Sequence, residues 1–381
     1  MKSNYRKLGE FIRQVDMRNI EDKKENLLGV SVQKVFIPSI ANTVGTDFTK
    51  YKVVKKSQFT YIPDTSRRGD KIGIALLEEY EEGLVSNVYT VFEIIDEKQL
   101  LPKYLMLWFS RAEFDRYARF KSHGSVREIM DWEEMCNVEL PVPDISKQRE
   151  IVKSYKIISD RIELKRKIND NLVCILDTLF NKIYAPLDDD TAVSFEELCS
   201  LASSKRVFAE DYCPEGIPFY RGKEITQKKN GEPINEPLFI SNSHYETLKA
   251  NYGVPKIGDI LITAVGTIGN SYMVQEENFY FKDGNIIWLK NFAKECVNYY
   301  LYDYMQTSTF RQQLQSVCIG STQTALTIVA LSKLELKVPS GNILKRYCEK
   351  SIVIRNAIQN NNVEIEHLIR LTQIILSSLS R

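Results

Sequence analysis

The chain has 381 residues, of which 43% are hydrophobic and 27% charged, and its formal net charge is +1. The length predicts two to three domains at about 150 residues each, and the apolar and charged fractions are ordinary for a soluble globular protein. No apolar run approaches the ~18 residues of a membrane span, and the opening residues lack the apolar core of a secretory signal. We therefore expect a cytoplasmic protein with no membrane partner. The cysteines and histidines are scattered, so we expect neither a metal site nor a disulfide framework.

Residues 1–144 have the pattern of a globular domain of mixed α and β character. Strands are predicted within 69–75 and 83–92, and one helix is predicted from 103 to 120. The domain closes on the stretch 114–143, FDRYARFKSHGSVREIMDWEEMCNVELPVP.

This closing stretch recurs without a gap at 310–339, FRQQLQSVCIGSTQTALTIVALSKLELKVP, which is 196 positions later. In both copies a Phe comes first, Gly-Ser follows, and an apolar alternation ends in Val-Pro. Self-similarity at a fixed offset indicates duplicated units. Two copies are too few for a solenoid, so they favour a pseudo-twofold molecule whose halves meet two similar targets.

A long helix is predicted from residue 145 to near Tyr184, before Pro186 and an acidic linker. Its apolar residues recur at alternating spacings of four and three, which is typical of a coiled-coil seam. A rod of roughly 55 Å would span about one and a half turns of duplex DNA at ~34 Å per turn. The seam positions are Ile151, Tyr155, Ile158, Ile162, Lys165, Asn169, Leu172, Leu176, Leu179 and Ile183.

A second mixed domain is predicted over 187–340. A strand is expected at 258–263, a glycine-rich turn at 266–270, and a hairpin at 280–289 because Asp-Gly lies between two apolar runs. One helix is predicted over 297–315. The two domains agree better at their ends than at their beginnings, as expected of domains that share a frame and read different sequences through their loops.

The second long helix, in 341–381, repeats the seam at the same offset. Both helices are basic, which suits nucleic acid but also an ordinary solvated face. The polar seam residues Lys165, Asn169 and Asn361 have two open interpretations: a buried contact that fixes register, or exposure where the helices splay. The seam positions are Tyr347, Ser351, Ile354, Ile358, Asn361, Ile365, Leu368, Thr372, Ile375 and Leu379.

Taken together, these segments resemble the specificity subunits of type I restriction-modification systems, over essentially the whole chain. Two departures are the absence of the Ile-Leu-Ile-Thr and Gly-Thr-Ile-Gly run from the first domain, and Ile343-Leu344-Lys345-Arg346 where Gln-Arg-Glu opens the other helix. The segments that carry the resemblance are YRKLGE at 5–10, GSVRE at 124–128, LPVPDISKQREIV at 140–152, GDILITAVGTIGN at 258–270, FKDGNIIWL at 281–289 and GSTQT at 320–324.

The resemblance implies an α+β fold with two target recognition domains, 1–144 and 187–340, separated by two long antiparallel coiled-coil helices, 145–186 and 341–381. It implies a non-catalytic subunit, without a cofactor, that reads a bipartite double-stranded DNA target. The implied partners are two adenine methyltransferase subunits and restriction or translocase subunits, with the methyltransferases expected at the helix ends 181–184 and 376–381.

Three alternatives remain open: the specificity subunit of a related methyltransferase-nuclease system, a nuclease with its own metal site, and a coiled-coil scaffold without DNA affinity. The chain lacks the Asn-Pro-Pro-aromatic turn of an adenine methyltransferase, and it lacks a P-loop. Pro143-Asp144 followed by Glu163-Leu164-Lys165 resembles a restriction-type metal site. About 19 residues of continuous helix would hold these carboxylates roughly 30 Å apart, so we interpret the match as chance.

Candidate DNA contacts are loop residues with hydroxyl, amide or cationic side chains, because these groups read base edges and bind phosphates. The alternative for each is a solvated loop residue. Gly124 and Gly320 are assigned to backbone geometry. In the first domain the candidates are Thr65, Ser66, Arg67, Arg68, Lys71, Ser122, Ser125 and Arg127. In the second domain they are Arg221, Lys223, Thr267, Asn270, Ser321, Thr322 and Gln323.

Overall fold

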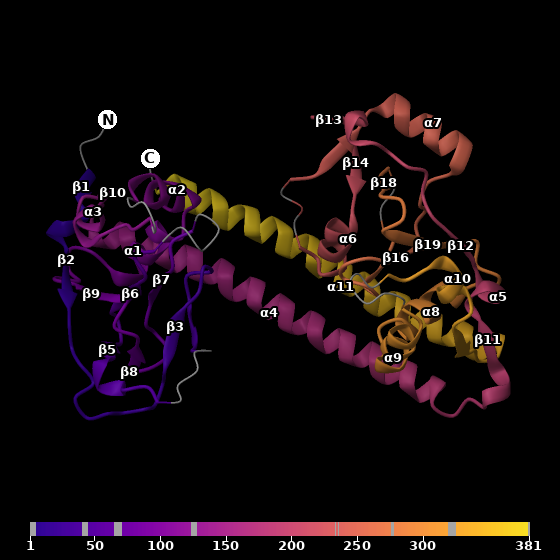
Figure 1. Ribbon diagram of the computed structural model, residues 1–381, viewed down its shortest axis with the longest axis horizontal. Coiled ribbons are helices and arrows are strands. Elements are labelled where there is room, and N and C mark those ends of the chain that lie inside the picture. Colours follow the sequence, from indigo (N-terminus) through magenta and orange to yellow (C-terminus); the bar gives the residue numbers. More distant parts are fainter. Residues whose placement is uncertain are drawn as a thin grey trace. The chain divides into compact units, whose positions relative to one another are not determined.

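The computed structural model describes residues 5–39, 45–64, 71–122, 128–232, 234, 236–275, 278–318 and 325–379. The chain divides into two compact units (Figure 1). The first unit comprises residues 1–162 and 368–381, and the second comprises residues 163–367. Each of the two long helices therefore contributes residues to both units.

The first unit is built on a four-stranded antiparallel sheet in the order β2-β9-β6-β7. Its strands alternate along the chain with loops, and their apolar side chains form one buried cluster with the helices α1 to α3. The strands of this sheet are β2 (Ile12–Val15), β9 (Thr90–Ile94), β6 (Phe59–Tyr61) and β7 (Ile74–Leu76). The helices are α1 (Pro102–Phe109), α2 (Ala112–Lys121) and α3 (Trp132–Cys136).

Three smaller antiparallel pairs complete the first unit, β1 with β10, β3 with β4, and β5 with β8. Leu28 of β3, Val54 of β5 and Val85 of β8 form a separate small core. The bounds are β1 (Tyr5–Lys7), β10 (Glu139–Pro141), β3 (Leu28–Val30), β4 (Phe36–Pro38), β5 (Lys52–Lys55) and β8 (Glu82–Val85), with single 3₁₀ turns at Leu8–Glu10 and Phe48–Lys50.

The single helix predicted over 103–120 is wrong, because the chain breaks between α1 and α2. Arg111 is extended, with φ −76° and ψ 141°. The break lets Phe109 and Phe114 pack together in the core with ring centroids 4.7 Å apart. Five residues apart on one straight helix, these two rings would point to different faces.

The second unit repeats this plan with a sheet in the order β12-β19-β16-β17, again fully antiparallel. Strands β11 and β20 pair as β1 and β10 do. The strands are β11 (Ala192–Ser194), β12 (Ser200–Ala202), β16 (Ile260–Thr263), β17 (Ser271–Met273), β19 (Ile286–Lys290) and β20 (Glu335–Lys337). The helices are α5 (Phe195–Leu198), α8 (Val297–Tyr304), α9 (Ser308–Val317) and α10 (Ile328–Ser332), with a 3₁₀ turn at Asp189–Thr191.

The sequence duplication is also a duplication of buried contacts. Phe114 and Phe310, which open the two repeats, are both buried in the cores of their units. The Tyr104 hydroxyl donates to the Pro141 carbonyl at 3.0 Å, and the Tyr300 hydroxyl donates to the Lys337 carbonyl at 3.1 Å. The 196-residue offset is therefore set by residues that build the same fold twice.

The second unit also carries a second four-stranded sheet, in the order β13-β15-β14-β18. The hairpin predicted over 280–289 is wrong, because the turn at Asp283-Gly284 passes the chain from this sheet to the other. Strand β18 runs parallel to β14, whereas β19 pairs with β12 and β16. The bounds are β13 (Tyr212–Cys213), β14 (Ile217–Tyr220), β15 (Leu238–Ile240), β18 (Tyr280–Phe281), α6 (Gly222–Lys229) and α7 (Asn242–Tyr252), with a 3₁₀ turn at Ala209–Asp211.

The single helix predicted over 297–315 is also wrong. It ends at Tyr304, and a new helix begins after Thr307, whose hydroxyl accepts from the Phe310 amide at 3.2 Å. This N-cap satisfies an amide that has no partner within the helix. The break lies at the position equivalent to the one between α1 and α2.

The two long helices are α4 (Ile145–Tyr184) and α11 (Gly341–Ser378). In the first unit, Ile151 of α4 and Leu376 of α11 pack against the same apolar cluster. In the second unit, the rings of Phe180 and Tyr347 lie 6.4 Å apart. Residue numbers rise along one helix as they fall along the other, so the helices pack antiparallel. The expected α+β fold with two packed long helices is confirmed. Among the described residues, no helix is long and apolar enough to cross a membrane.

The polar seam residues form a hydrogen-bonded contact between the helices. Lys165 Nζ donates to Asn361 Oδ1 at 2.8 Å, and Asn361 Nδ2 donates to Asn169 Oδ1 at 2.8 Å. Asn169 in turn donates to Asn362, and Lys165 forms an ion pair with Glu364. Asn361 is only 8% exposed, and Lys165 and Asn169 are partly buried. The three residues therefore form a contact between packed helices and are not exposed where the helices splay. That this contact fixes register remains a prediction.

Candidate nucleic-acid interface

In each unit, one β-bridge joins the ends of two loops chosen from the sequence as candidate contacts. Asp64 pairs with Ile129 in the first unit, and Val265 pairs with Ala325 in the second. Ile129 and Ala325 are equivalent at the 196-residue offset. The loop after the third strand of each sheet, counted in sheet order, is therefore anchored beside the segment before α3 or α10. Several candidate residues lie outside the described ranges: Thr65, Ser66, Arg67, Arg68, Ser125, Arg127, Ser321, Thr322 and Gln323.

The turn between β16 and β17, residues 264–270, is stabilised by hydrogen bonds to Thr263. The Asn270 amide donates to Thr263 Oγ1 at 3.1 Å, and the Gly269 amide donates to the Thr263 carbonyl at 2.9 Å. Gly269 has φ +89°, and a Cβ there would lie 2.8 Å from Leu314 Cδ1. This backbone conformation favours glycine, and a Cβ would also require the Leu314 side chain to move. The turn is thus a fixed feature of the second unit.

Two side chains of α6, Thr226 and Lys229, form hydrogen bonds with this turn. Thr226 Oγ1 lies 3.2 Å from Thr267 Oγ1 and accepts from Asn270 Nδ2, also at 3.2 Å. Lys229 Nζ donates to Asn270 Oδ1 at 3.4 Å. The candidate residues Thr267 and Asn270 are therefore joined to α6, and are not simply solvated loop residues.

The remaining candidates of the second unit stand at the start of α6. Arg221 Nη2 donates to Glu224 Oε1 at 2.6 Å, and the Glu224 side chain is 1% exposed. Burial opposes ionisation of Glu224, but the hydrogen bonds from Arg221 outweigh it, so the pKa of this carboxyl is lowered. Arg221, whose side chain is 41% exposed, thus forms an ion pair with the buried Glu224. Lys223 is exposed.

In the first unit, Lys71 is exposed, and the Ser122 hydroxyl donates to the Ala118 carbonyl at 2.6 Å at the end of α2. Beside them lies an ion pair that the sequence pattern did not reveal. Lys34 Nζ is 2.8 Å from Asp115 Oδ1, and both side chains are largely buried. Lys34 also donates to the Phe109 carbonyl. Burial lowers the pKa of Lys34, although Asp115 opposes the shift.

The second unit has an open hollow of about 550 Å³ beside the 264–270 turn. Apolar side chains of Ile268, Met305, Phe310 and Leu314 line it. Two cations, Lys229 and Arg311, line it as well. Neither cation is among the candidate loop residues, because Lys229 lies on α6 and Arg311 lies on α9. One signal was available: at the 196-residue offset, Arg311 corresponds to Asp115, which reverses the charge within the repeat.

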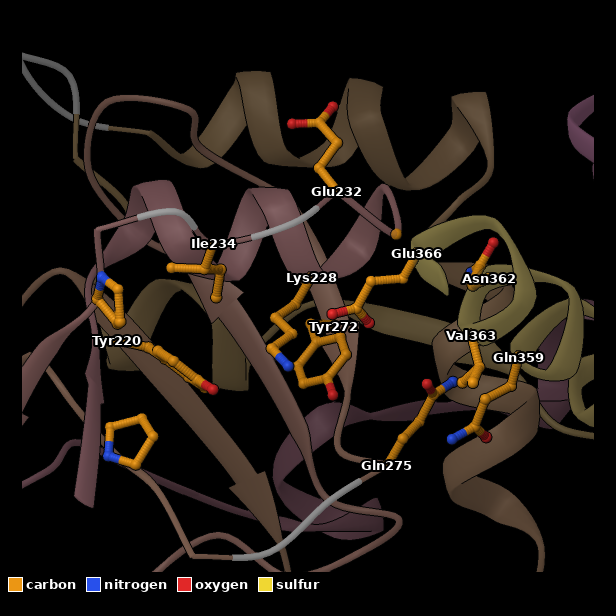
Figure 2. Close-up of a pocket in the computed structure, with 13 residues that line it drawn as sticks. Tyr220, Lys228, Glu232, Ile234, Tyr272, Gln275, Gln359, Asn362, Val363 and Glu366 are labelled. Atoms are coloured by element: carbon orange, nitrogen blue, oxygen red, sulfur yellow. The ribbon is translucent and has the colours of Figure 1, made fainter. Parts of the chain in front are cut away.

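A second hollow, of about 330 Å³, is lined by Lys228 of α6 and by residues of the sheets and of α11 (Figure 2). Tyr220 and Tyr272 come from the sheets, and Gln359, Asn362, Val363 and Glu366 come from α11. Lys228 Nζ lies 5.5 Å from the centre of the Tyr220 ring. Gly231 approaches α11 so closely that a Cβ would lie 2.8 Å from Asn362 Cγ. Residues of the added sheet and of α11 thus line the same hollow.

The described residues include no group of three or more His, Cys, Asp and Glu side chains that could hold a metal ion. Asp144 accepts from the amides of Ser146 and Lys147 at 3.0 Å each, as an N-cap of α4. Glu163 pairs with Lys167 one turn along the same helix, at 2.6 Å. Both carboxylates of the nuclease-like pattern therefore have local roles in α4.

Three comparisons with known proteins agree with one another. A family profile for the type I restriction modification DNA specificity domain matches residues 2–173 and 189–365. A Haemophilus influenzae protein named as a type I restriction enzyme specificity subunit is 27% identical over 225 residues, which are 57% of this chain and 55% of that protein. The chain thus spans about half the length of this curated relative.

A crystal structure of a type I restriction-modification S subunit from M. genitalium has a similar fold, with a TM-score of 0.60. The alignment covers 99% of this chain and 96% of that one, at 13% sequence identity. At this identity the likeness concerns the fold alone.

Proposed function

Since this chain belongs to the type I restriction-modification DNA specificity family, we propose that it is the non-catalytic subunit that selects the DNA sequence on which such a system acts. One observation carries the proposal. The same four-stranded sheet, with the same bridge between two loops, occurs twice in one chain. Each copy reads one half of a split double-stranded target.

The two copies differ where a difference in sequence preference requires it. The first unit adds the pairs β3-β4 and β5-β8, whereas the second adds a four-stranded sheet with α6 and α7. Because loops and additions on a shared scaffold carry specificity, two different half-sites follow. We assign them to recognition domains at 1–144 and 187–340, with residues 145–186 and 341–381 as the frame. The candidate loop residues named above are the proposed DNA contacts.

Two adenine methyltransferase subunits are the proposed catalytic partners, and restriction or translocase subunits join them in the cytoplasm. Exposed apolar side chains on the long helices support the binding of two methyltransferase subunits. Ile157 on α4 and Val353 on α11 are both exposed, and so are Ile175 and Leu371. Each pair is equivalent at the 196-residue offset, so the helices offer two similar surfaces, as two copies of one partner require.

Some residues at the helix ends that are expected to bind these partners are packed against other residues of the chain. Leu379 is 4% exposed and belongs to the core of the first unit. The Tyr184 ring stacks on Phe180 at 5.2 Å. Docking at these ends would therefore use their exposed neighbours, such as Asn181 and Lys182.

Co-expression with the adenine methyltransferase of the same system, followed by methylome sequencing, tests the proposal. We expect methylated adenines in a motif of two defined halves around an undefined spacer, and no methylation without this chain. A continuous motif, or methylation independent of this chain, would contradict the proposal. A metal-dependent cut by the purified chain that Glu163→Gln abolishes would favour the nuclease alternative.

A further inference from the structure

The same corner of the fold is filled in the first unit and open in the second. In the first unit, Lys34 donates to the Phe109 carbonyl and pairs with Asp115 at 2.8 Å. The residues equivalent to Phe109 and Asp115 at the 196-residue offset are Met305 and Arg311, and both line the 550 Å³ hollow. The first unit therefore closes this corner with its own ion pair, and the second unit does not.

The hollow in the second unit has positive charge without a carboxylate to balance it. None of its lining residues is Asp or Glu. Lys229 is partly buried, and its hydrogen bond is to the neutral Asn270 amide at 3.4 Å. Burial, and next the charge of Arg311, lower the pKa of Lys229. In the described part of the chain, no carboxylate forms an ion pair with Arg311.

A bound anion would balance the positive charges of Lys229 and Arg311. Two like charges that face one hollow destabilise each other, and a bound anion between them adds an attraction to each that offsets their mutual repulsion. Lys and Arg are the usual ligands of phosphate oxygens, and the Gln315 side-chain amide in the same hollow can donate as well. The hollow also adjoins the turn that carries Thr267 and Asn270.

We propose that this hollow binds a phosphate of the DNA backbone, with Lys229 and Arg311 as its ligands. The inference rests on the proposed function, because it takes DNA as the source of the phosphate. With this site, the two units would contact the DNA backbone differently, since the first unit has no counterpart to the site among its described residues. Phosphate contacts position a protein on the duplex without selecting sequence.

The test uses the complex of this chain with its methyltransferase subunits and a duplex that carries the methylated motif. Binding constants are measured over a range of salt concentrations for the parent, Arg311→Ala, Arg311→Asp and Lys294→Gln. Lys294 is the matched control, because it is an exposed lysine of the same unit outside the hollow.

We expect Arg311→Ala to weaken binding by roughly threefold or more on every duplex, and to reduce the slope of log K against log salt by about 0.9. Arg311→Asp should do the same while keeping the parent melting temperature, because the introduced carboxylate can pair with Lys229. Lys294→Gln should match the parent. An Arg311→Ala complex with parental affinity and slope would overturn the assignment to DNA phosphate.

A second arm titrates the full chain alone with inorganic phosphate, against chloride at equal ionic strength, and follows the melting temperature. We expect stabilisation of the parent and of Lys294→Gln, and none for Arg311→Ala, because a ligand stabilises the state that binds it. Stabilisation with unchanged DNA binding would identify a free anion as the ligand and overturn the DNA source. No stabilisation in this arm would overturn the site itself. A parent complex without sequence-selective binding would instead refute the proposed function, and this arm would still decide the site.

Discussion

Gln148, in the first turn of α4, is completely buried, and backbone groups satisfy its side-chain amide. Its Oε1 accepts from the Leu101 amide at 2.9 Å. Its Nε2 donates to the carbonyls of Gln99 and Pro143 at 2.8 Å each. The residue thus ties the start of the long helix to the loop before α1. At the equivalent position of α11, Leu344 packs into the apolar core of the second unit.

Gln148→Leu should lower the free energy of unfolding of the first unit by about 2–3 kcal/mol, because it leaves buried backbone groups without partners. Urea unfolding followed by circular dichroism measures the change. Gln33→Leu is the control at an exposed glutamine of the same unit, and it should stay within about 0.5 kcal/mol of the parent. Equal effects of the two substitutions would show that the Gln148 contacts contribute nothing.

Residue-scale roles were only partly predictable from the sequence. The Gln-Arg-Glu motif marked Gln148, but its purpose depends on Leu101, which is far away in the sequence. The pair of Lys34 and Asp115 left no local signal, because each is an ordinary polar residue until the fold brings them together. Arg221 remains a predicted DNA contact, but that prediction did not include its ion pair with Glu224, three residues later.

The polar contact between α4 and α11 joins the two long helices through hydrogen bonds of Lys165, Asn169 and Asn361. Buried polar groups in an apolar seam fix register at a cost in stability. Asn361→Ala should lower the free energy of unfolding of the second unit by about 1–2 kcal/mol, since Lys165 and Asn169 each lose a buried partner. Asn360→Ala, at the exposed neighbouring position, should cost less than about 0.5 kcal/mol.

A double-mutant cycle makes the test specific to the contact. Asn169→Ala combined with Asn361→Ala should show a coupling energy of about 1 kcal/mol, because the second substitution removes a bond that is already lost. Strictly additive effects would mean that the two residues act independently, contrary to their 2.8 Å hydrogen bond.

Elements with a long periodic pattern were predictable, and those defined by non-local pairing were not. The heptad seam marked both long helices because every one of its positions is at least partly buried. Asp283-Gly284 did form a turn, but no local pattern could assign β18 and β19 to different sheets. The first unit lacks the Ile-Leu-Ile-Thr run and still forms β6 and β7, because different apolar residues such as Phe59 and Ile74 satisfy the same sheet.

In the proposed function, the pair of long helices sets the spacing between the two half-sites. Inserting four residues after Asn169 in α4, and four before Asn360 in α11, lengthens both helices by about 6 Å. The polar contact remains intact on one side of the insertion. Four residues nearly complete a turn, with an added rotation of about 40°, so the apolar seam stays roughly aligned.

We expect the insertion variant to methylate a motif with unchanged halves and a spacer longer by one or two base pairs, as methylome sequencing reports. A variant of parental length, with alanines at the exposed positions beside the insertion points, is the control and should keep the parental spacer. An active insertion variant with the parental spacer would show that the helices do not set the distance.

Each proposed recognition domain should read its own half of the target. The most direct measurement is methylome sequencing of a chimaera in which residues 1–144 come from a homologous specificity subunit with a different motif. We expect one half of the methylated motif to change to the donor's sequence, while the other half and the spacer stay as they were. A change in both halves, or in neither, would contradict it.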